Sequence, residues 1–94
     1  MLAITRATVP AEQEATFLAA AQETLGLLAD RDGFRRGHVG RAMDDPTLWV
    51  LSTEWDGVGS YRRGLSAYDV KVAIAPLMAY VVNEPSAYQA VVTR

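Results

Sequence analysis

The sequence contains no cysteine, and this absence removes several kinds of chemistry at once. Disulfide bonds, thiolate nucleophiles, thiolate-bound zinc and iron–sulfur clusters all need cysteine sulfur from the chain. Histidine is nearly absent as well, since His38 is the only one. Most zinc and non-haem iron sites use two or three histidines, so a site here would need carboxylates or a second chain. We therefore expect a protein without a tightly bound metal.

Nucleotide, nucleic-acid and membrane signals are missing too. The spacing of Gly33, Gly37 and Gly40 matches neither the dinucleotide-binding nor the P-loop pattern, so we expect no cofactor. A net charge of -2 provides no basic surface for nucleic acid or an anionic membrane. No apolar run approaches the roughly 18 residues of a membrane span. Because Leu2-Ala3-Ile4 lacks the charged region of an export signal, we expect a cytoplasmic location.

What is present is an ordinary globular composition. Half of the residues are apolar and 21% are charged. A chain of 94 residues is the size of one domain, so we assign residues 1–94 to a single domain.

The first half of the chain predicts a strand and a long helix. The segment Met1–Thr8 contains β-favouring residues, and Pro10 follows it at a position where a first helical residue is tolerated. Apolar residues then recur at helical spacing, at Phe17, Leu18, Ala21, Leu25 and Leu28. Gly33 indicates where this helix has stopped.

Two strands joined by a hairpin turn come next. Phe34–Met43 is a polar strand interrupted by glycines, and Leu48–Trp55 is strongly apolar. The intervening Asp44-Asp45-Pro46 is typical of a turn.

The last part of the chain predicts two helical pieces and a strand. Asp56 is a candidate N-cap for a short helix to about Leu65. The segment Ser66–Asp69 has capping-box spacing and predicts another helix, which Pro76 should kink or end near Ala75. Ala87–Thr93 is the predicted final strand.

The order β-α-β-β-α-β is the ferredoxin-like α+β pattern, with a four-stranded antiparallel sheet and helices on one face. The segments Leu2–Ile4, Leu48–Leu51 and Ala90–Val92 are apolar on both strand faces, so the second face also favours burial. We expect a homodimer whose two sheets pack face to face into an α+β barrel. The alternative is a monomer with a partly exposed apolar sheet.

With these elements in place, nearly the whole chain resembles the antibiotic biosynthesis monooxygenase family of dimeric α+β barrel proteins. The resemblance rests on Gly33-Phe34, Asp44-Asp45-Pro46, Trp55 and the closing Tyr88-Gln89-Ala90-Val91-Val92. Because such a small scaffold hosts several unrelated functions, these motifs identify the fold better than an activity.

Two groups within the family can be compared with this sequence. Members that degrade haem carry Asn, Trp and His at positions that align with Thr5, Gly64 and Ile74, so all three are missing here. Members that oxidise polycyclic phenols with dioxygen and no cofactor carry a strand-ending Trp and a Tyr six residues later. This pair is kept as Trp55 and Tyr61.

Other parts of the phenol-oxidising pattern are absent. The family's Asn on the third strand aligns with Leu51, and its Arg in the last helix aligns with Ala75. Its helical His has no counterpart, because the nearest positions are Gly64 and Asp69.

Three residues are candidates for catalysis. Tyr61 could hydrogen-bond a phenolic substrate and hold or shuttle its proton, although its helical spacing also suits a core tyrosine. Trp55 could stack on a flat ligand, or simply pin a helix to the sheet. Histidine is the side chain type that most readily accepts a proton near neutral pH, which makes His38 a candidate base, but its polar strand equally suits a surface or interface histidine.

Substrate contacts are predicted for Trp55 and Tyr61 together with Thr5, Arg62 and Tyr68. Small neighbours around Thr5 would leave space beneath a helix for a pocket, or would let the helix pack closely. The leading hypothesis is a homodimeric cofactor-independent monooxygenase that oxidises a flat phenolic or polyketide-like aromatic substrate with O2. The competing hypothesis is a non-catalytic dimeric protein that binds a small molecule on the same scaffold.

Overall fold

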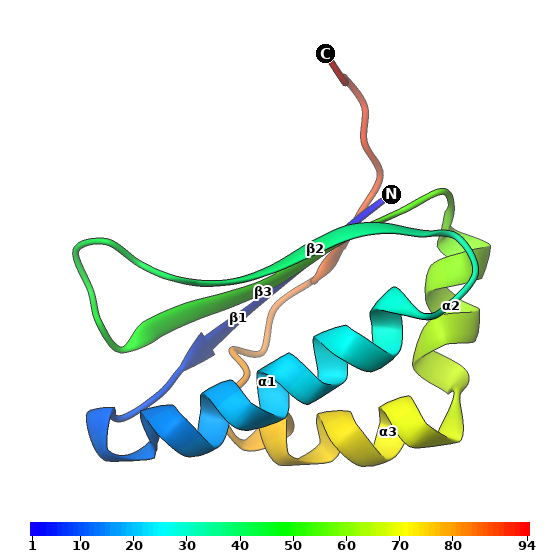
Figure 1. Ribbon diagram of the computed structural model, residues 1–94. Coiled ribbons are helices and arrows are strands. Elements are labelled where there is room, and N and C mark those ends of the chain that lie inside the picture. The colour runs from blue at the N-terminus through cyan, green and yellow to red at the C-terminus, as the bar shows by residue number, and fades with distance from the viewer.

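The computed structural model describes all residues, 1–94. Four strands and three α-helices follow one another along the chain, with two short 3-10 turns (Figure 1). The elements are β1 (Leu2–Thr8), η1 (Ala11–Gln13), α1 (Glu14–Ala29), β2 (Phe34–Arg41), β3 (Leu48–Trp55), α2 (Val58–Ser66), α3 (Tyr68–Ile74), η2 (Ala75–Ala79) and β4 (Ala87–Tyr88).

The four strands form one antiparallel sheet in the order β2-β3-β1-β4. This order and the α+β arrangement confirm the predicted ferredoxin-like fold. The long pairing of β1 with β3 runs from Leu2 opposite Glu54 to Thr8 opposite Leu48. All three helices lie on one side of the sheet, and its other face carries no helix (Figure 1).

Strand alternation decides which side chains meet the helices. In β3, Trp49, Thr53 and Trp55 are buried on the helix side, because residues two apart share a face. One core cluster forms around Trp49 and Phe17, whose ring centroids are 5.5 Å apart, and a second forms around Trp55. The helix-facing side of the sheet therefore holds the core and leaves room for a cavity between the two clusters.

Several predicted boundaries are confirmed. β3 spans Leu48–Trp55 as expected, and the first helical turn begins directly after Pro10. α3 ends at Ile74, and η2 carries Pro76 in its first turn. The reason is local, since proline cannot donate the backbone hydrogen bond that a continuing α-helix needs.

The predicted helix caps are wrong. α2 has Gly57 rather than Asp56 at its N-cap, and α3 begins at Tyr68 without any side-chain cap. The Ser66 hydroxyl donates instead to the Arg62 carbonyl one turn back in α2. With the two helices joined through Ala67 alone, Ser66 still belongs to the end of α2, and its hydroxyl satisfies a carbonyl there.

The last strand is much shorter than the predicted Ala87–Thr93, because β4 contains only Ala87 and Tyr88. Tyr88 pairs with Leu2, the first residue of β1, so the chain beyond Tyr88 has no neighbouring strand to join. The tail 89–94 extends past the sheet and away from the helices (Figure 1). β2 likewise ends at Arg41, two residues before the predicted Met43.

Candidate functional site

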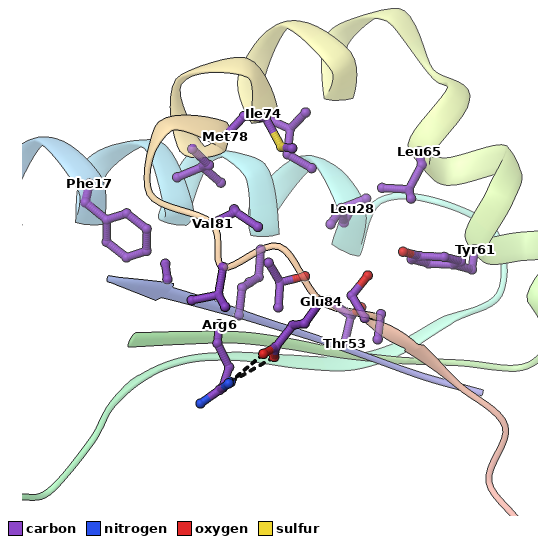
Figure 2. Close-up of a pocket in the computed structure, with 17 residues that line it drawn as sticks. Arg6, Phe17, Leu28, Thr53, Tyr61, Leu65, Ile74, Met78, Val81 and Glu84 are labelled. Atoms are coloured by element: carbon purple, nitrogen blue, oxygen red, sulfur yellow. Dashed lines mark hydrogen bonds and ion pairs between the residues drawn. The ribbon is translucent and has the colours of Figure 1, made fainter. Parts of the chain in front are cut away.

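An apolar cavity of about 240 Å³ lies between the sheet and the helices. Twelve of its 17 lining residues are hydrophobic (Figure 2). Phe17 lies at one end of the cavity and Tyr61 at the other, with Ile74 and Met78 on the helix side (Figure 2). Enclosed, mostly apolar cavities with a few polar groups are the usual form of small-molecule sites.

The floor of the cavity comes from the two central strands. Thr5 of β1 lies directly opposite Leu51 of β3, and Thr53 lies two residues further along β3. All three side chains are on the helix-facing side of the sheet, because alternation places them there. Thr5 therefore lines the cavity, and its contact with a substrate stays a prediction.

A segment without regular structure closes one side of the cavity. We call residues Tyr80–Ser86 the strap, because they run along the edge of β1. Backbone hydrogen bonds tie the strap to β1: Val82 N–H donates to the Arg6 carbonyl at 2.9 Å, and Ile4 N–H donates to the Ser86 carbonyl at 2.7 Å. Strap residues at positions 81, 82, 84 and 86 line the cavity.

An ion pair also fastens the strap. The Arg6 guanidinium donates two hydrogen bonds to the Glu84 carboxylate, with Nε 2.8 Å from Oε2 (Figure 2). These hydrogen bonds hold the pKa of the Glu84 carboxyl below its ordinary value. Glu84 is therefore charged at neutral pH and engaged with Arg6.

Tyr61 projects from α2 with its hydroxyl directed into the cavity (Figure 2). Its ring packs edge-on against Trp55, with centroids 6.0 Å apart. The side chain is half-buried, and its hydroxyl has no hydrogen-bond partner within the chain. Tyr61 thus combines a packing contact on one side with a free polar group facing the cavity.

Trp55 stands behind the cavity wall rather than in it. Only 1% of its surface is exposed, and its indole N–H donates to Thr53 Oγ1 at 2.9 Å. The ring fills the space left by Gly64, where a Cβ atom would lie 2.8 Å from Trp55 Cη2. Trp55 therefore supports Tyr61 and Thr53, both of which line the cavity.

The other predicted site residues lie apart from the cavity in a single chain. His38 is exposed on β2 opposite Ser52, on the sheet face away from the helices. Arg62 and Tyr68 are also exposed, and Tyr68 retains 82% of its accessible surface. Their roles in catalysis or substrate binding stay predictions.

Thr53 and the strap were not among the site residues predicted from the sequence. Alternation along β3 could have identified Thr53, because it shares a strand face with Trp55 and Leu51. The strap offered no such signal, since an irregular segment has no hydrophobic period. The chain has no group of three or more His, Cys, Asp or Glu side chains placed to hold a metal ion. None of the helices is sufficiently long and apolar to span a membrane.

The sequence and the fold were compared with those of known proteins. Residues 1–71 match the family model described as antibiotic biosynthesis monooxygenase. The structure is similar to SnoaB, a cofactor-independent oxygenase from Streptomyces nogalater, with 24% identity, a TM-score of 0.78 and coverage of 96% of this chain and 94% of that one. It is also similar to a conserved protein from Methanosarcina mazei Go1, with 16% identity, a TM-score of 0.79 and coverage of 88% and 82%.

Sequence identities at this level show a shared fold rather than a shared activity. A comparison with curated protein sequences gave no match. The family match, however, spans about three quarters of the chain, and the fold agrees with it along nearly its whole length. The chain therefore belongs to the antibiotic biosynthesis monooxygenase family.

Proposed function

We propose that this protein is a cofactor-independent monooxygenase that oxidises a flat phenolic or polyketide-like aromatic substrate with O2. One observation supports this most directly: an apolar cavity that contains, at one end, the unpartnered hydroxyl of Tyr61. Such a cavity suits a ring system, and the hydroxyl suits the oxygen atom that the ring carries. The likeness to SnoaB is in keeping with this chemistry.

In this reaction the substrate itself supplies the electrons. A deprotonated phenol is electron-rich enough to reduce dioxygen. The ring loses its phenolic hydrogen and the hydrogen of the attacked carbon, one oxygen atom becomes a new carbonyl, and the other leaves as water. The product is a quinone. The apolar walls exclude bulk water, which strengthens every hydrogen bond made to the anion.

Tyr61 is the residue that we assign to proton transfer. Its hydroxyl faces the cavity without a competing partner, so it is available to the phenolic oxygen of a substrate. A group that holds or shuttles a proton must be within hydrogen-bond reach of the reacting oxygen. The side chain is fixed by its edge-on contact with Trp55, which keeps the hydroxyl directed inward.

A second candidate function is non-catalytic binding of an aromatic molecule. Leu51 lines the cavity at the position where phenol-oxidising relatives are expected to carry an asparagine. The charged groups at the cavity, Arg6 and Glu84, are engaged with each other. Tyr61 would then serve recognition alone.

Oxygen consumption separates the two functions. Purified protein treated with a chelator would be mixed with a panel of hydroxylated one- to three-ring aromatics in an oxygen-electrode cell. Protein-dependent uptake with a quinone product, unchanged by the chelator, is the expected result. Saturable binding of a panel member without uptake would favour the binding protein, and the monooxygenase proposal would then be wrong.

We also propose that the functional unit is a homodimer joined through the sheet face opposite the helices. Ile4 and Val50 lie on this face, because their neighbours Ala3 and Trp49 are buried on the helix side. The tail 89–94 leaves the sheet on the same side and exposes Val91 and Val92 (Figure 1). The same face carries Ser52 and His38, and an apolar patch with a polar surround is typical of an interface.

Replacing Val50 with aspartate should convert the dimer into a monomer. The new carboxylate would be buried without a partner wherever two sheets pack together, which opposes association strongly. Analytical ultracentrifugation should give the mass of one chain for Val50→Asp and of two chains for the unmodified protein. Val72→Asp, on the exposed side of α3, should remain dimeric. A monomeric unmodified protein, or a Val50→Asp variant that stays dimeric, would contradict this proposal.

A further inference from the structure

Thr53 is a buried polar residue in the middle of the sheet that has few polar neighbours. It is 5% exposed and lines the cavity floor. Its neighbours across the sheet are Ala3 on β1 and Gly37 on β2, neither of which offers a polar side chain. The only side-chain hydrogen bond to Thr53 comes from the Trp55 indole, at 2.9 Å.

The direction of that hydrogen bond is fixed by chemistry. An indole nitrogen can only donate, so the Thr53 oxygen must accept. The hydroxyl proton of Thr53 then remains available for donation, because Thr53 Oγ1 donates to no acceptor within the chain. Accepting one hydrogen bond also polarises a hydroxyl and makes it a stronger donor in surroundings of low polarity.

We propose that Thr53 is a specificity-determining residue: its hydroxyl, oriented by the Trp55 indole, donates a hydrogen bond to the oxygen atom of an aromatic ligand. This inference rests on the proposed function, because it takes the ligand to be an oxygen-bearing aromatic. Thr53 donates a hydrogen bond to the oxygen atom of the ligand, while Tyr61, at the same end of the cavity, holds or transfers the phenolic proton (Figure 2). Trp55 acts through Thr53 and is a positioning residue.

The cavity volume indicates the size of the ligand. An apolar cavity of about 150 Å³ in another protein binds benzene. The cavity here measures about 240 Å³, which suits a ligand of two fused rings. Phe17, Ile74 and Met78 would surround the apolar ring, and the oxygen atom would lie toward Thr53 (Figure 2).

The test compares two probes that differ by one oxygen atom, 1-naphthol and naphthalene. Titration calorimetry should show that the unmodified protein binds 1-naphthol about a hundredfold more tightly than naphthalene, because Thr53 and Tyr61 each contribute a hydrogen bond worth about tenfold in affinity. In Thr53→Val this ratio of affinities should fall about tenfold, because only the Tyr61 hydroxyl then contacts the oxygen atom, whereas Thr53→Ser should retain the full ratio. Naphthalene binding reports on the integrity of the cavity in every variant.

Thr53→Val leaves the buried Trp55 indole without an acceptor and could impair folding. The double variant Thr53→Val with Trp55→Phe removes both partners, which is close to neutral for stability. The ratio should be about tenfold lower than in the unmodified protein in this variant also. Thr24→Val is the matched control, because Thr24 is equally buried but its hydroxyl donates to Ala20 O within α1.

An unchanged ratio in Thr53→Val or in the double variant would overturn the inference, as would equal binding of both probes by the unmodified protein. The oxygen-uptake experiment is independent of this outcome. A protein that selects 1-naphthol through Thr53 but consumes no oxygen would refute the monooxygenase proposal alone. A protein that oxidises phenols with Thr53→Val unchanged in its selectivity would refute only the role of Thr53.

Discussion

Replacement of Tyr61 with phenylalanine is expected to lower turnover about a hundredfold, the usual contribution of one acid–base group. The same change should leave the melting temperature within about 2 °C, because substitutions that break no buried hydrogen bond cost little stability. The structure gives the reason, since the Tyr61 hydroxyl contacts no partner within the chain and its ring contact with Trp55 is kept by phenylalanine. Steady-state oxygen uptake and a thermal melt measure the two effects.

Tyr80→Phe is the matched control for this experiment. Tyr80 is also half-buried and packs edge-on against an aromatic ring, that of Phe17, but it does not line the cavity. Its turnover should stay within about twofold of the unmodified protein. If Tyr61→Phe instead melts several degrees lower with full turnover per folded molecule, Tyr61 is a core residue and its catalytic assignment is wrong.

The second large effect concerns stability. Replacing Gly33 with alanine should lower the free energy of unfolding by about 2–4 kcal/mol, through backbone strain and overpacking together. Gly33 has a φ of 85°, and an added Cβ would lie 2.5 Å from Asp56 Oδ1 and would overlap the Ser60 hydroxyl. The Gly33 carbonyl also accepts the Asp56 N–H, so the surrounding backbone cannot shift freely. The melting temperature should fall by about 10 °C or more.

Gly26→Ala should change stability in the opposite direction. Gly26 lies within α1, and nothing is within 4 Å of the position of an added Cβ. Alanine is better than glycine in a helix interior by roughly 0.5–1 kcal/mol, so this variant should melt slightly higher. Thermal melts of Gly33→Ala and Gly26→Ala measure the two effects. Equal stability of the two variants would show that the turn at Gly33 accommodates a Cβ atom without strain.

Local patterns in the sequence were sufficient for most of the fold. The apolar run of β3, the proline before the first helical turn and Pro76 after α3 each act through the backbone of their own segment. Gly33 was correctly taken as a stop signal, and its positive φ supplies the reason. Such features are predictable because they do not depend on distant parts of the chain.

The errors occurred where a distant partner decides the outcome. Ala87–Thr93 has the composition of a strand, but the length of β4 is set by where β1 begins. The capping-box spacing at Ser66 was a weak guide, because Ser66 ends α2 and its hydroxyl donates to the Arg62 carbonyl of that helix instead of capping α3. A strand forms only where a second strand lies beside it, and a cap only where the helix end has a free N–H group within reach. The sequence of one segment does not identify that partner.

The residues of the candidate site also divide into those predictable from local patterns and those that depend on distant partners. Tyr61 was identified through the resemblance, and Thr5 through the small residues around it, since both signals are local. Strand alternation could have placed Thr53 on the cavity side of β3, but its hydrogen bond from the Trp55 indole is visible only in the structure. The strap residues could not have been identified, because their place against β1 follows from tertiary hydrogen bonds alone.

Because the strap carries part of the cavity wall but neither of the two hydroxyls, the shape of the ligand and its polar groups are recognised by different segments. Its attachments to β1 are mainly backbone hydrogen bonds, which most side chains at positions 80–86 would leave intact. Mutations there could enlarge or narrow the cavity while β3 and α2 hold their hydroxyls in place. A combinatorial library confined to Val81, Val82 and Ser86 would therefore be the economical route to new ligand preferences, and natural divergence on this scaffold has the same route open to it.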